Sequence, residues 1–204
     1  MDGIVVATTT NRIDARIVQE AVNYGVHYYA GSSDDVLSRY YKAAKFYGAD
    51  RIVRITGDCP YIMPDIVDLL VKQSGECAYA SNTHRRTYPK GLDCEIFSFE
   101  ELKRVYNTSS NREHVTTDMN LEYSLEDEHD HSKVRLTVDY NFDIRDMWDY
   151  HSLIGDVYQY SQLKEILDSL KGKIIKKGSE DYDMCVRIVT GKHHQSMNGN
   201  PTYP

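Results

Sequence analysis

Residues 51–60 read Arg51-Ile52-Val53-Arg54-Ile55-Thr56-Gly57-Asp58-Cys59-Pro60. The first six residues are rich in β-branched side chains, and the glycine and proline that follow are typical of a turn. Residues before this strand have helical periodicity and end at Gly48, and Pro64 after it suits the first turn of another helix. The stretch therefore predicts a strand placed between two helices.

The same alternation runs through the first part of the chain. Strands separated by helices of about ten to fifteen residues form βαβ units, which build parallel sheets with helices on both faces. We therefore predict an α/β fold with a mostly parallel sheet. The strands are expected over 4–9, 26–30, 51–56 and 77–80, and the helices over 13–24, 32–47 and 64–72.

Burial can be predicted for the first two elements. The run over 4–9 is apolar without alternation, which indicates a strand buried on both faces. The helix over 13–24 carries one apolar stripe that we expect to face the core, formed by Ile13, Ile17, Ala21 and Tyr24. In the next helix, Asp35 follows Ser32 at the spacing of a capping box.

The second half is less regular. Ser98 and Glu101 have capping-box spacing before a helix to Tyr106, and Ser110 and Glu113 repeat this spacing before a helix predicted to reach about Tyr123. We interpret residues 1–190 as one domain and 191–204 as a flexible tail. The other elements expected here are strands over 92–97 and 134–138 and helices over 143–153 and 161–170.

Composition excludes several classes of protein. Lys and Arg number 24 against 31 Asp and Glu, a net charge of −7, which disfavours a nucleic-acid binder. No apolar run approaches the roughly 20 residues that span a bilayer, and the N-terminus lacks a basic region before its apolar stretch. The four cysteines include no CxxC pair, which is typical of reduced thiols. We therefore expect a cytoplasmic protein without nucleic-acid or membrane partners.

Two aspartates stand at the ends of predicted strands. Asp58 and Asp139 each follow an apolar run, and ligands of open parallel sheets bind beyond the carboxyl ends of the strands. Because Mg²⁺ takes oxygen ligands, two converging carboxylates form a candidate magnesium site. The alternative is that each aspartate stabilises a turn, as aspartates at strand ends commonly do.

Five ordered stretches carry a family resemblance. They are Gly31-Ser32-Ser33-Asp34-Asp35-Val36-Leu37-Ser38-Arg39-Tyr40, Val53 to Pro60, Tyr88-Pro89-Lys90-Gly91-Leu92-Asp93-Cys94-Glu95, Arg112-Glu113-His114 and Arg135-Leu136-Thr137-Val138-Asp139. Together they resemble the spore-coat polysaccharide biosynthesis branch of the cytidylyltransferases, relatives of the CMP-sialic acid and CMP-Kdo synthetases. The resemblance implies a Rossmann-like fold of the nucleotide-diphospho-sugar transferase type. It also implies transfer of CMP from CTP to an acidic or amino sugar, with Mg²⁺ and release of pyrophosphate, in a protein that forms homodimers.

The resemblance also implies roles for single residues. Asp58 and Asp139 take the positions of the family's catalytic, metal-binding aspartates, and the nucleotide-binding positions are Thr56, Ser38 and Arg39. The positions that face the sugar are Asp93, Glu95, Glu113 and His114. Simpler interpretations stay open: Glu113 as a capping residue, His114 as a partly buried helix histidine, and Arg39 as the partner of Asp34 or Asp35 on a helix surface.

The chain departs from the family pattern at its start. The run over 4–9 resembles the family's second strand, so the usual first strand and its cation-rich triphosphate loop are expected to be lacking. Strands 4–9 and 51–56 should then each lose a ladder partner. Three functions remain open: a cytidylyltransferase, a non-catalytic remnant or partner subunit of such an enzyme, and a glycosyltransferase that uses a nucleotide-sugar.

Overall fold

The computed structural model describes residues 3–140, 143–144, 151, 155, 157 and 159–171. The chain divides into two compact units, each assembled from three separate stretches. Unit 1 comprises Met1–Arg54, Val71–Ser81 and Glu95–Ser124, and unit 2 comprises Ile55–Leu70, Asn82–Cys94 and Leu125–Pro204. Because the chain passes repeatedly from one unit to the other, no single linker separates them.

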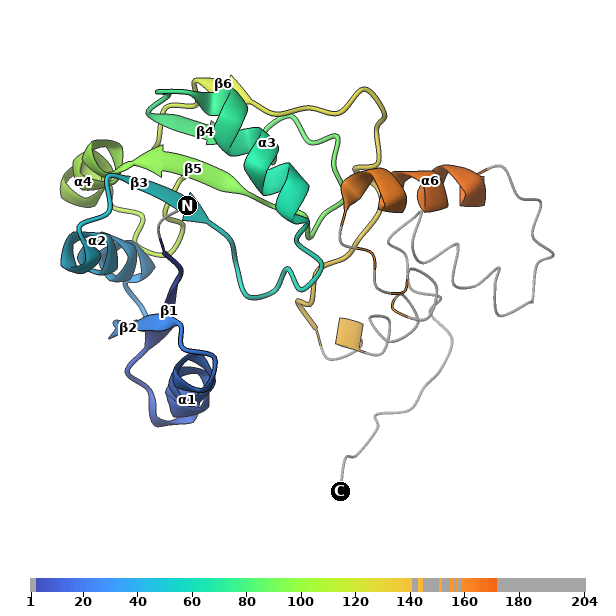
Figure 1. The fold of residues 1–204 in the computed structure, drawn as a ribbon. Helices are drawn as coiled ribbons and strands as arrows, with labels where there is room; N and C mark the ends of the chain where they lie inside the picture. The colour runs from blue at the N-terminus through green and yellow to red at the C-terminus, as the bar shows by residue number, and fades with distance from the viewer. Residues whose placement is uncertain are drawn as a thin grey trace, which may run out of the picture. The chain divides into compact units, whose positions relative to one another are not determined.

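Unit 1 contains the two sheets of the described residues (Figure 1). In the first sheet β1 and β2 are parallel, and the short 3-10 helix η1 and helix α1 connect them. The second sheet has the order β3-β5-β4-β6, in which β5 is antiparallel to β3 and β4 while β4 and β6 are parallel. The elements are β1 (Val5–Thr9), η1 (Arg12–Asp14), α1 (Ala15–Asn23), β2 (His27–Gly31), β3 (Arg51–Arg54), β4 (Tyr79–Ser81), β5 (Glu95–Ser98) and β6 (Tyr123–Ser124).

The α/β class predicted from the sequence is confirmed, with one difference in strand direction. β5 returns antiparallel between two strands that run the same way, because the chain reaches it through residues 82–94 and not through a helical crossover. Among the described strands, β1 pairs only with β2 and β3 pairs only with β5. Each of these two strands therefore has one edge without a strand partner, as the sequence led us to expect.

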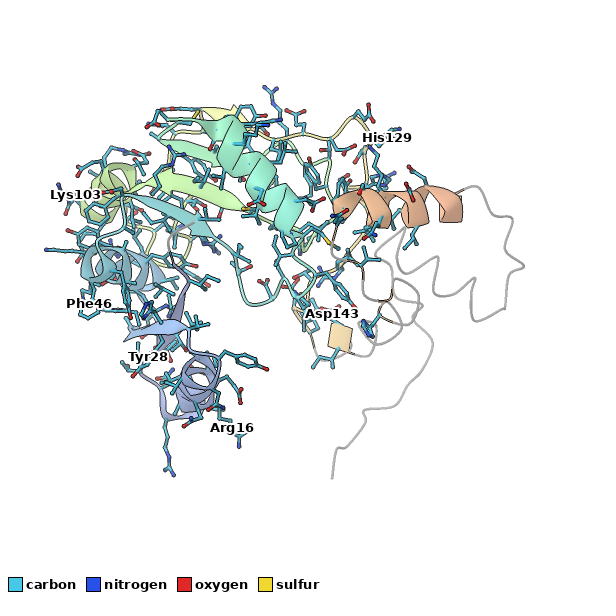
Figure 2. All side chains as sticks on the ribbon, viewed as in Figure 1. Arg16, Tyr28, Phe46, Lys103, His129 and Asp143 are labelled. Carbon is cyan, nitrogen blue, oxygen red and sulfur yellow. The ribbon has the colours of Figure 1, made fainter. Side chains whose placement is uncertain are left out.

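Residues in and beside the small sheet are more exposed than the sequence predicted, because one edge of β1 has no strand partner among the described strands. The prediction that residues 4–9 are buried on both faces is wrong: Ile4 is 63% exposed, and of β1 only Thr8 is buried. The predicted stripe on α1 is also exposed, at Ile13, Ile17 and Tyr24, while Ala21 is buried. A sheet of two strands offers too little apolar surface to cover a helix face. Tyr28 and Phe46 are exposed aromatic side chains of the same unit (Figure 2).

The core of unit 1 lies between two helices and the second sheet. Helices α2 (Val36–Tyr47) and α4 (Phe99–Thr108) contribute Leu37 and Leu102, which are fully buried against Phe97 of β5. Full burial of such a side chain contributes about 1.5–3 kcal/mol to folding. The core therefore fixes the position of α2, whose first turn carries two of the predicted nucleotide-binding residues.

The N-cap predicted for α4 is observed, whereas the N-cap of α2 differs from the predicted one. Ser98 accepts a hydrogen bond from the Glu101 amide at 3.1 Å, as predicted, and Gly48 ends α2 with a φ of +65°. The N-cap of α2 is Asp35, which accepts from the Ser38 amide at 2.8 Å. Ser32 instead accepts from the Asp35 amide at 3.0 Å, so it holds the turn before the helix.

Two elements predicted in the second half are absent from the described residues. In place of a helix after Ser110, residues 110–122 form turns, because Asn111 Oδ1 accepts from the amides of Glu113 and His114. Residues 134–138 form a single parallel bridge, between Lys90 and Arg135, and not a strand.

Two further helices that the structure describes confirm the positions predicted from the sequence. Helices α3 (Pro64–Ser74) and α6 (Tyr160–Lys171) lie where helices were predicted. The predicted helix 143–153 lies mostly outside the described residues, and the predicted tail 191–204 lies wholly outside them. No described helix has both the length and the apolar character needed to cross a membrane.

Candidate functional site

Two backbone segments of unit 2 meet at Asp58. The Val138 amide donates to the Asp58 carbonyl oxygen at 2.8 Å, and the Thr137 hydroxyl donates to the same oxygen at 3.0 Å. The Thr137 hydroxyl also lies 3.4 Å from Asp58 Oδ2. Asp139 follows directly, so the structure brings the two predicted metal-binding aspartates onto adjacent backbone segments.

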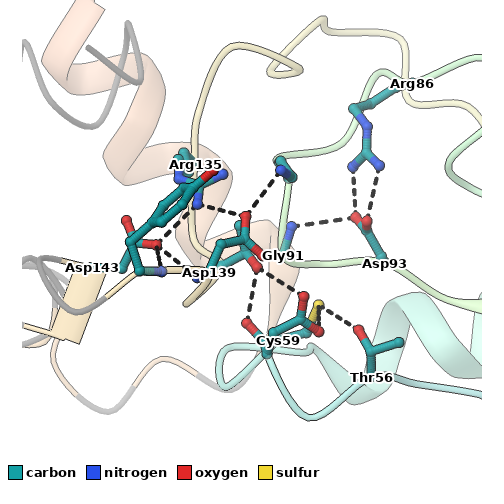
Figure 3. A network of polar contacts seen from close by, with 12 residues as sticks. Thr56, Cys59, Arg86, Gly91, Asp93, Arg135, Asp139 and Asp143 are labelled. Atoms are coloured by element: carbon teal, nitrogen blue, oxygen red, sulfur yellow. Dashed lines mark hydrogen bonds and ion pairs between the residues drawn. The ribbon is translucent and has the colours of Figure 1, made fainter. Parts of the chain in front are cut away.

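The carboxylate of Asp139 is held by two cations through one oxygen (Figure 3). Its Oδ2 accepts from Arg135 Nη2 at 2.6 Å and from Lys90 Nζ at 3.2 Å. Oδ1 takes no hydrogen bond from the described residues. The Arg135 hydrogen bond, together with Lys90, holds the pKa of Asp139 below its usual range despite partial burial. Asp139 is therefore ionised at neutral pH, and among the described residues its hydrogen bonds go to Oδ2 and leave Oδ1 without one.

A third carboxylate, that of Asp143, also binds Arg135. Its side chain is 3% exposed, and its Oδ2 accepts from Arg135 Nη2 at 3.0 Å. The same oxygen accepts from the backbone amides of Asp139 at 2.7 Å and Tyr140 at 2.9 Å. Burial raises the pKa of Asp143, but these three donors outweigh it and the net shift is downward.

The segment that carries Lys90 is fixed by the backbone. The Lys90 amide donates to the Val134 carbonyl at 2.9 Å, and the Leu136 amide donates to the Lys90 carbonyl at 2.6 Å. Gly91 follows with a φ of +103°, a conformation that only glycine adopts readily. This pairing places the Lys90 ammonium on Asp139, 49 residues away in the sequence.

Asp93, a predicted sugar contact, is bound by an arginine of the same unit. Arg86 donates to its two oxygens at 2.6 and 2.9 Å, and the Gly91 amide donates to Oδ1 at 3.3 Å. The two ionic side chains are 25% and 27% exposed. A sugar at Asp93 would therefore meet an Arg86–Asp93 pair and not a free carboxylate.

Thr56 lies against a thiol at the start of the Asp58 loop. Thr56 Oγ1 is 3.4 Å from the Sγ of Cys59, which is buried. Burial raises the pKa of the Cys59 thiol to about 11, so the group is protonated at neutral pH and is not a nucleophile. Cys59 is therefore a packing residue of the loop.

The other predicted sites belong to unit 1, and Glu95 is one of two buried residues among them. Its Oε1 accepts from the hydroxyls of Tyr79 at 2.6 Å and Thr116 at 2.9 Å, and its Oε2 is paired with Arg54. The Glu95 side chain is 7% exposed. Both oxygens are therefore already bound by protein groups.

The first turn of α2 carries Ser38 and Arg39. Ser38 is buried, and Arg39 Nη1 donates to the Ser32 carbonyl at 2.7 Å; the Arg39 guanidinium thus binds this carbonyl and neither Asp34 nor Asp35. Asp35 is instead bound by Arg112, which donates to both of its oxygens at 3.0 Å. Glu113 and His114, next to Arg112, are exposed, so His114 is not the partly buried helix residue that the simpler interpretation required.

The donor chemistry in unit 2 fits Mg²⁺. Asp58 and Asp139 supply carboxylate oxygens from adjacent segments, and Mg²⁺ in phosphate-transfer sites is commonly held by one or two carboxylates together with substrate phosphates. Within the described residues, no three Asp, Glu, His or Cys side chains gather as a metal cage. The ion would therefore be shared between these carboxylates and a phosphate ligand.

Comparison with known proteins decides the family. A family model described as cytidylyltransferase matches residues 1–130, more than half of the chain. The chain belongs to the cytidylyltransferase family. The matched range includes the Asp58 loop and the Lys90 segment and ends before Arg135 and Asp139.

The chain is also similar to three known proteins. An uncharacterised protein of Methanocaldococcus jannaschii is 38% identical over 121 residues, which cover 57% of this chain and 49% of that protein. The spore coat polysaccharide biosynthesis protein SpsF of Bacillus subtilis is 25% identical over 123 residues, with 56% and 49% covered. A solved cytidylyltransferase of Leptospira borgpetersenii serovar Hardjo-bovis is 31% identical with a TM-score of 0.74, covering 84% of this chain and 80% of that one. The chain spans about half the length of the two curated relatives.

In this cytidylyltransferase family member, the sequence did not single out several residues that shape the site. Arg135 binds both Asp139 and Asp143, and Arg112 binds Asp35 across 77 residues of sequence. Arg112 and Arg135 stand in stretches that carried the family resemblance, which was the available signal. Their roles depend on partners far along the chain, so spacing alone gives no sign of them.

Proposed function

We propose that the protein transfers CMP from CTP to an acidic or amino sugar. The sugar hydroxyl oxygen forms a bond to the α-phosphorus, the bond from that phosphorus to the pyrophosphate oxygen breaks, and the hydroxyl proton is released. The observation that carries this proposal is the pair Asp58 and Asp139 on adjacent segments, with two cations on Asp139, in a chain of the cytidylyltransferase family.

Asp58 and Asp139 are the residues that would hold Mg²⁺. When bound, the ion would neutralise charge on the phosphates and so favour attack at phosphorus. Lys90 and Arg135 belong to the same cluster, and their charges keep Asp139 ionised. Catalysis of this kind depends on positioning and on fixed electrostatic groups rather than on a covalent enzyme intermediate.

The nucleotide and sugar contacts are part of the same proposal. By the family resemblance, Thr56 is the proposed nucleotide contact of unit 2, and Ser38 and Arg39 are those proposed for unit 1. Asp93, Glu113 and His114 would face the sugar, and the exposure of Glu113 and His114 leaves them accessible to a ligand. Glu95 would need to exchange a protein partner for the sugar, because both of its oxygens are bound.

A role in making precursors of a surface polysaccharide is supported by one relative. The Bacillus subtilis protein SpsF is described as a spore coat polysaccharide biosynthesis protein and is 25% identical over 123 residues. We place the reaction in the cytoplasm and expect a homodimer, which size-exclusion chromatography with light scattering would test.

The first experiment is isothermal titration of the purified chain with CTP and Mg²⁺, with ATP as the control nucleotide. Selective binding of CTP supports the proposal, and release of pyrophosphate with a panel of acidic and amino sugars then identifies the acceptor. A folded chain that binds neither nucleotide would instead be a non-catalytic member of the family. Turnover of a nucleotide-sugar without CTP would indicate a glycosyltransferase.

A further inference from the structure

One oxygen of Asp143 collects three hydrogen bonds around the candidate metal ligand. Asp143 Oδ2 accepts from the amide of Asp139 at 2.7 Å, from the amide of Tyr140 at 2.9 Å and from Arg135 Nη2 at 3.0 Å. The side chain is 3% exposed. A carboxylate at this depth is stable as an anion only when such donors compensate for its loss of water.

These contacts act on Asp139 from two directions. The amide bonds fix the backbone turn from which the Asp139 side chain starts. Arg135 Nη2 is shared, since it lies 3.0 Å from Asp143 Oδ2 and 2.6 Å from Asp139 Oδ2 (Figure 3). Asp143 thus binds both the backbone amide of Asp139 and the Arg135 guanidinium, which in turn binds the Asp139 carboxylate.

An aspartate that only caps a turn needs hydrogen bonds from backbone amides and no ion pair such as that between Asp143 and Arg135. Asp130 offers the comparison within the same unit: its Oδ1 accepts from the Ser132 amide at 2.9 Å, and its side chain is exposed. Asp143 has the backbone contacts of a cap and also the buried charge pair that leads to Asp139.

We propose that Asp143 is a positioning residue for Asp139. It keeps Oδ2 of Asp139 engaged by Arg135 and so leaves Oδ1 for the metal–nucleotide substrate. This role rests on the proposed function and deepens it, because Asp143 binds Arg135 and the Asp139 backbone and would act on the metal ligand through them. Positioning partners behind metal ligands typically change metal affinity or activity by about 10–100-fold when mutated.

The test measures how much Mg²⁺ strengthens CTP binding, using titrations of the full chain with and without the ion. For Asp143→Asn we expect this enhancement to fall by about 10-fold or more, with the Mg²⁺-free CTP affinity unchanged. Asp130→Asn is the matched control and should leave both quantities unchanged. A melting temperature recorded for each variant separates this effect from loss of the fold.

Arg135→Lys is the second variant, because lysine keeps the charge but its shorter side chain does not place a nitrogen where Arg135 Nη2 donates to both carboxylates. We expect the same loss of Mg²⁺ enhancement. If the enhancement is unchanged in a folded Asp143→Asn protein, or in Arg135→Lys where Asp143→Asn does not fold, the positioning role is overturned. Failure of the wild-type chain to bind CTP with Mg²⁺ would instead overturn the proposed function, and the role of Asp143 with it.

Discussion

Gly91 and the backbone of Leu136 approach each other so closely that no side chain fits between them. A Cβ built on Gly91 would lie 2.4 Å from both the carbonyl carbon and the carbonyl oxygen of Leu136. Gly91 also has a φ of +103°. This approach joins the Lys90 segment to the segment that carries Arg135 and Asp139, so it sets the geometry of the candidate site.

Gly91→Ala should therefore destabilise unit 2. The left-handed backbone alone costs about 1–3 kcal/mol for a residue with a Cβ, and the clash with Leu136 adds to this. Urea unfolding measures the loss. Gly57→Ala is the control, because no atom lies within 4 Å of its Cβ and its backbone is not left-handed; we expect a change of about 0.5 kcal/mol or less there. Equal effects of the two substitutions would contradict the importance of this contact.

Replacing either candidate metal ligand should remove the effect of Mg²⁺ on CTP binding. We expect Asp58→Asn and Asp139→Asn to bind CTP equally with and without the ion, because a neutral amide is a poor ligand for Mg²⁺. Titration calorimetry checks this, and circular dichroism checks the fold. Asp68→Asn, an exposed aspartate of α3, should retain the wild-type response to Mg²⁺. Unchanged Mg²⁺ dependence in both site variants would end the assignment.

Substitutions of Glu95 and Glu113 should have different effects, because Glu95 belongs to a buried network and Glu113 is exposed. Glu95→Ala leaves the Arg54 charge without its partner, so we expect a loss of roughly 3 kcal/mol in unfolding free energy. Glu113→Gln, at an exposed position, should change stability by about 0.5 kcal/mol or less. If Glu113 contacts the sugar, its variant should raise the KM for sugar several-fold. A stable Glu95→Ala protein would show that the buried network contributes little.

The Arg112–Asp35 pair should make part of the stability of unit 1 depend on pH. Partial burial raises the pKa of Asp35, but the Arg112 ion pair and the Ser38 amide lower it overall from its ordinary value of 3.8. The pair therefore contributes fully above pH 3.8, and this contribution is lost as the pH falls through the lower pKa of the folded state.

A double-mutant cycle of Arg112→Ala and Asp35→Ala tests this pair. Because its side chains are 31% and 34% exposed, we expect a coupling of about 0.5–1 kcal/mol at pH 7. The coupling should be smaller at pH 3. Repeating the cycle in high salt should also reduce it, since the pair is accessible to solvent. A coupling that does not change between pH 7 and pH 3 would show that Asp35 charge does not contribute.

Most secondary structure before residue 110 could be predicted, because it depends on neighbours in the sequence. Gly48 ends α2 by adopting a left-handed conformation, and Ser98 caps α4 through an amide three residues later. The helix predicted after Ser110 does not form because Asn111 Oδ1 accepts from the amides of Glu113 and His114, which gives these amides a non-helical partner. Where two local signals competed, periodicity and spacing did not show which would prevail.

The sequence by itself determined the α/β class, the main helices of the first half and the family resemblance, since periodicity, caps and ordered motifs are local properties. Tertiary structure alone decided that Arg135 and Lys90 bind Asp139, that Asp143 holds Arg135, and that Ile13 and Ile17 of α1 are exposed. The ion pair of Asp139 with Lys90 and the burial of each side chain depend on which distant segments meet. The local pattern of a strand or helix does not carry that information.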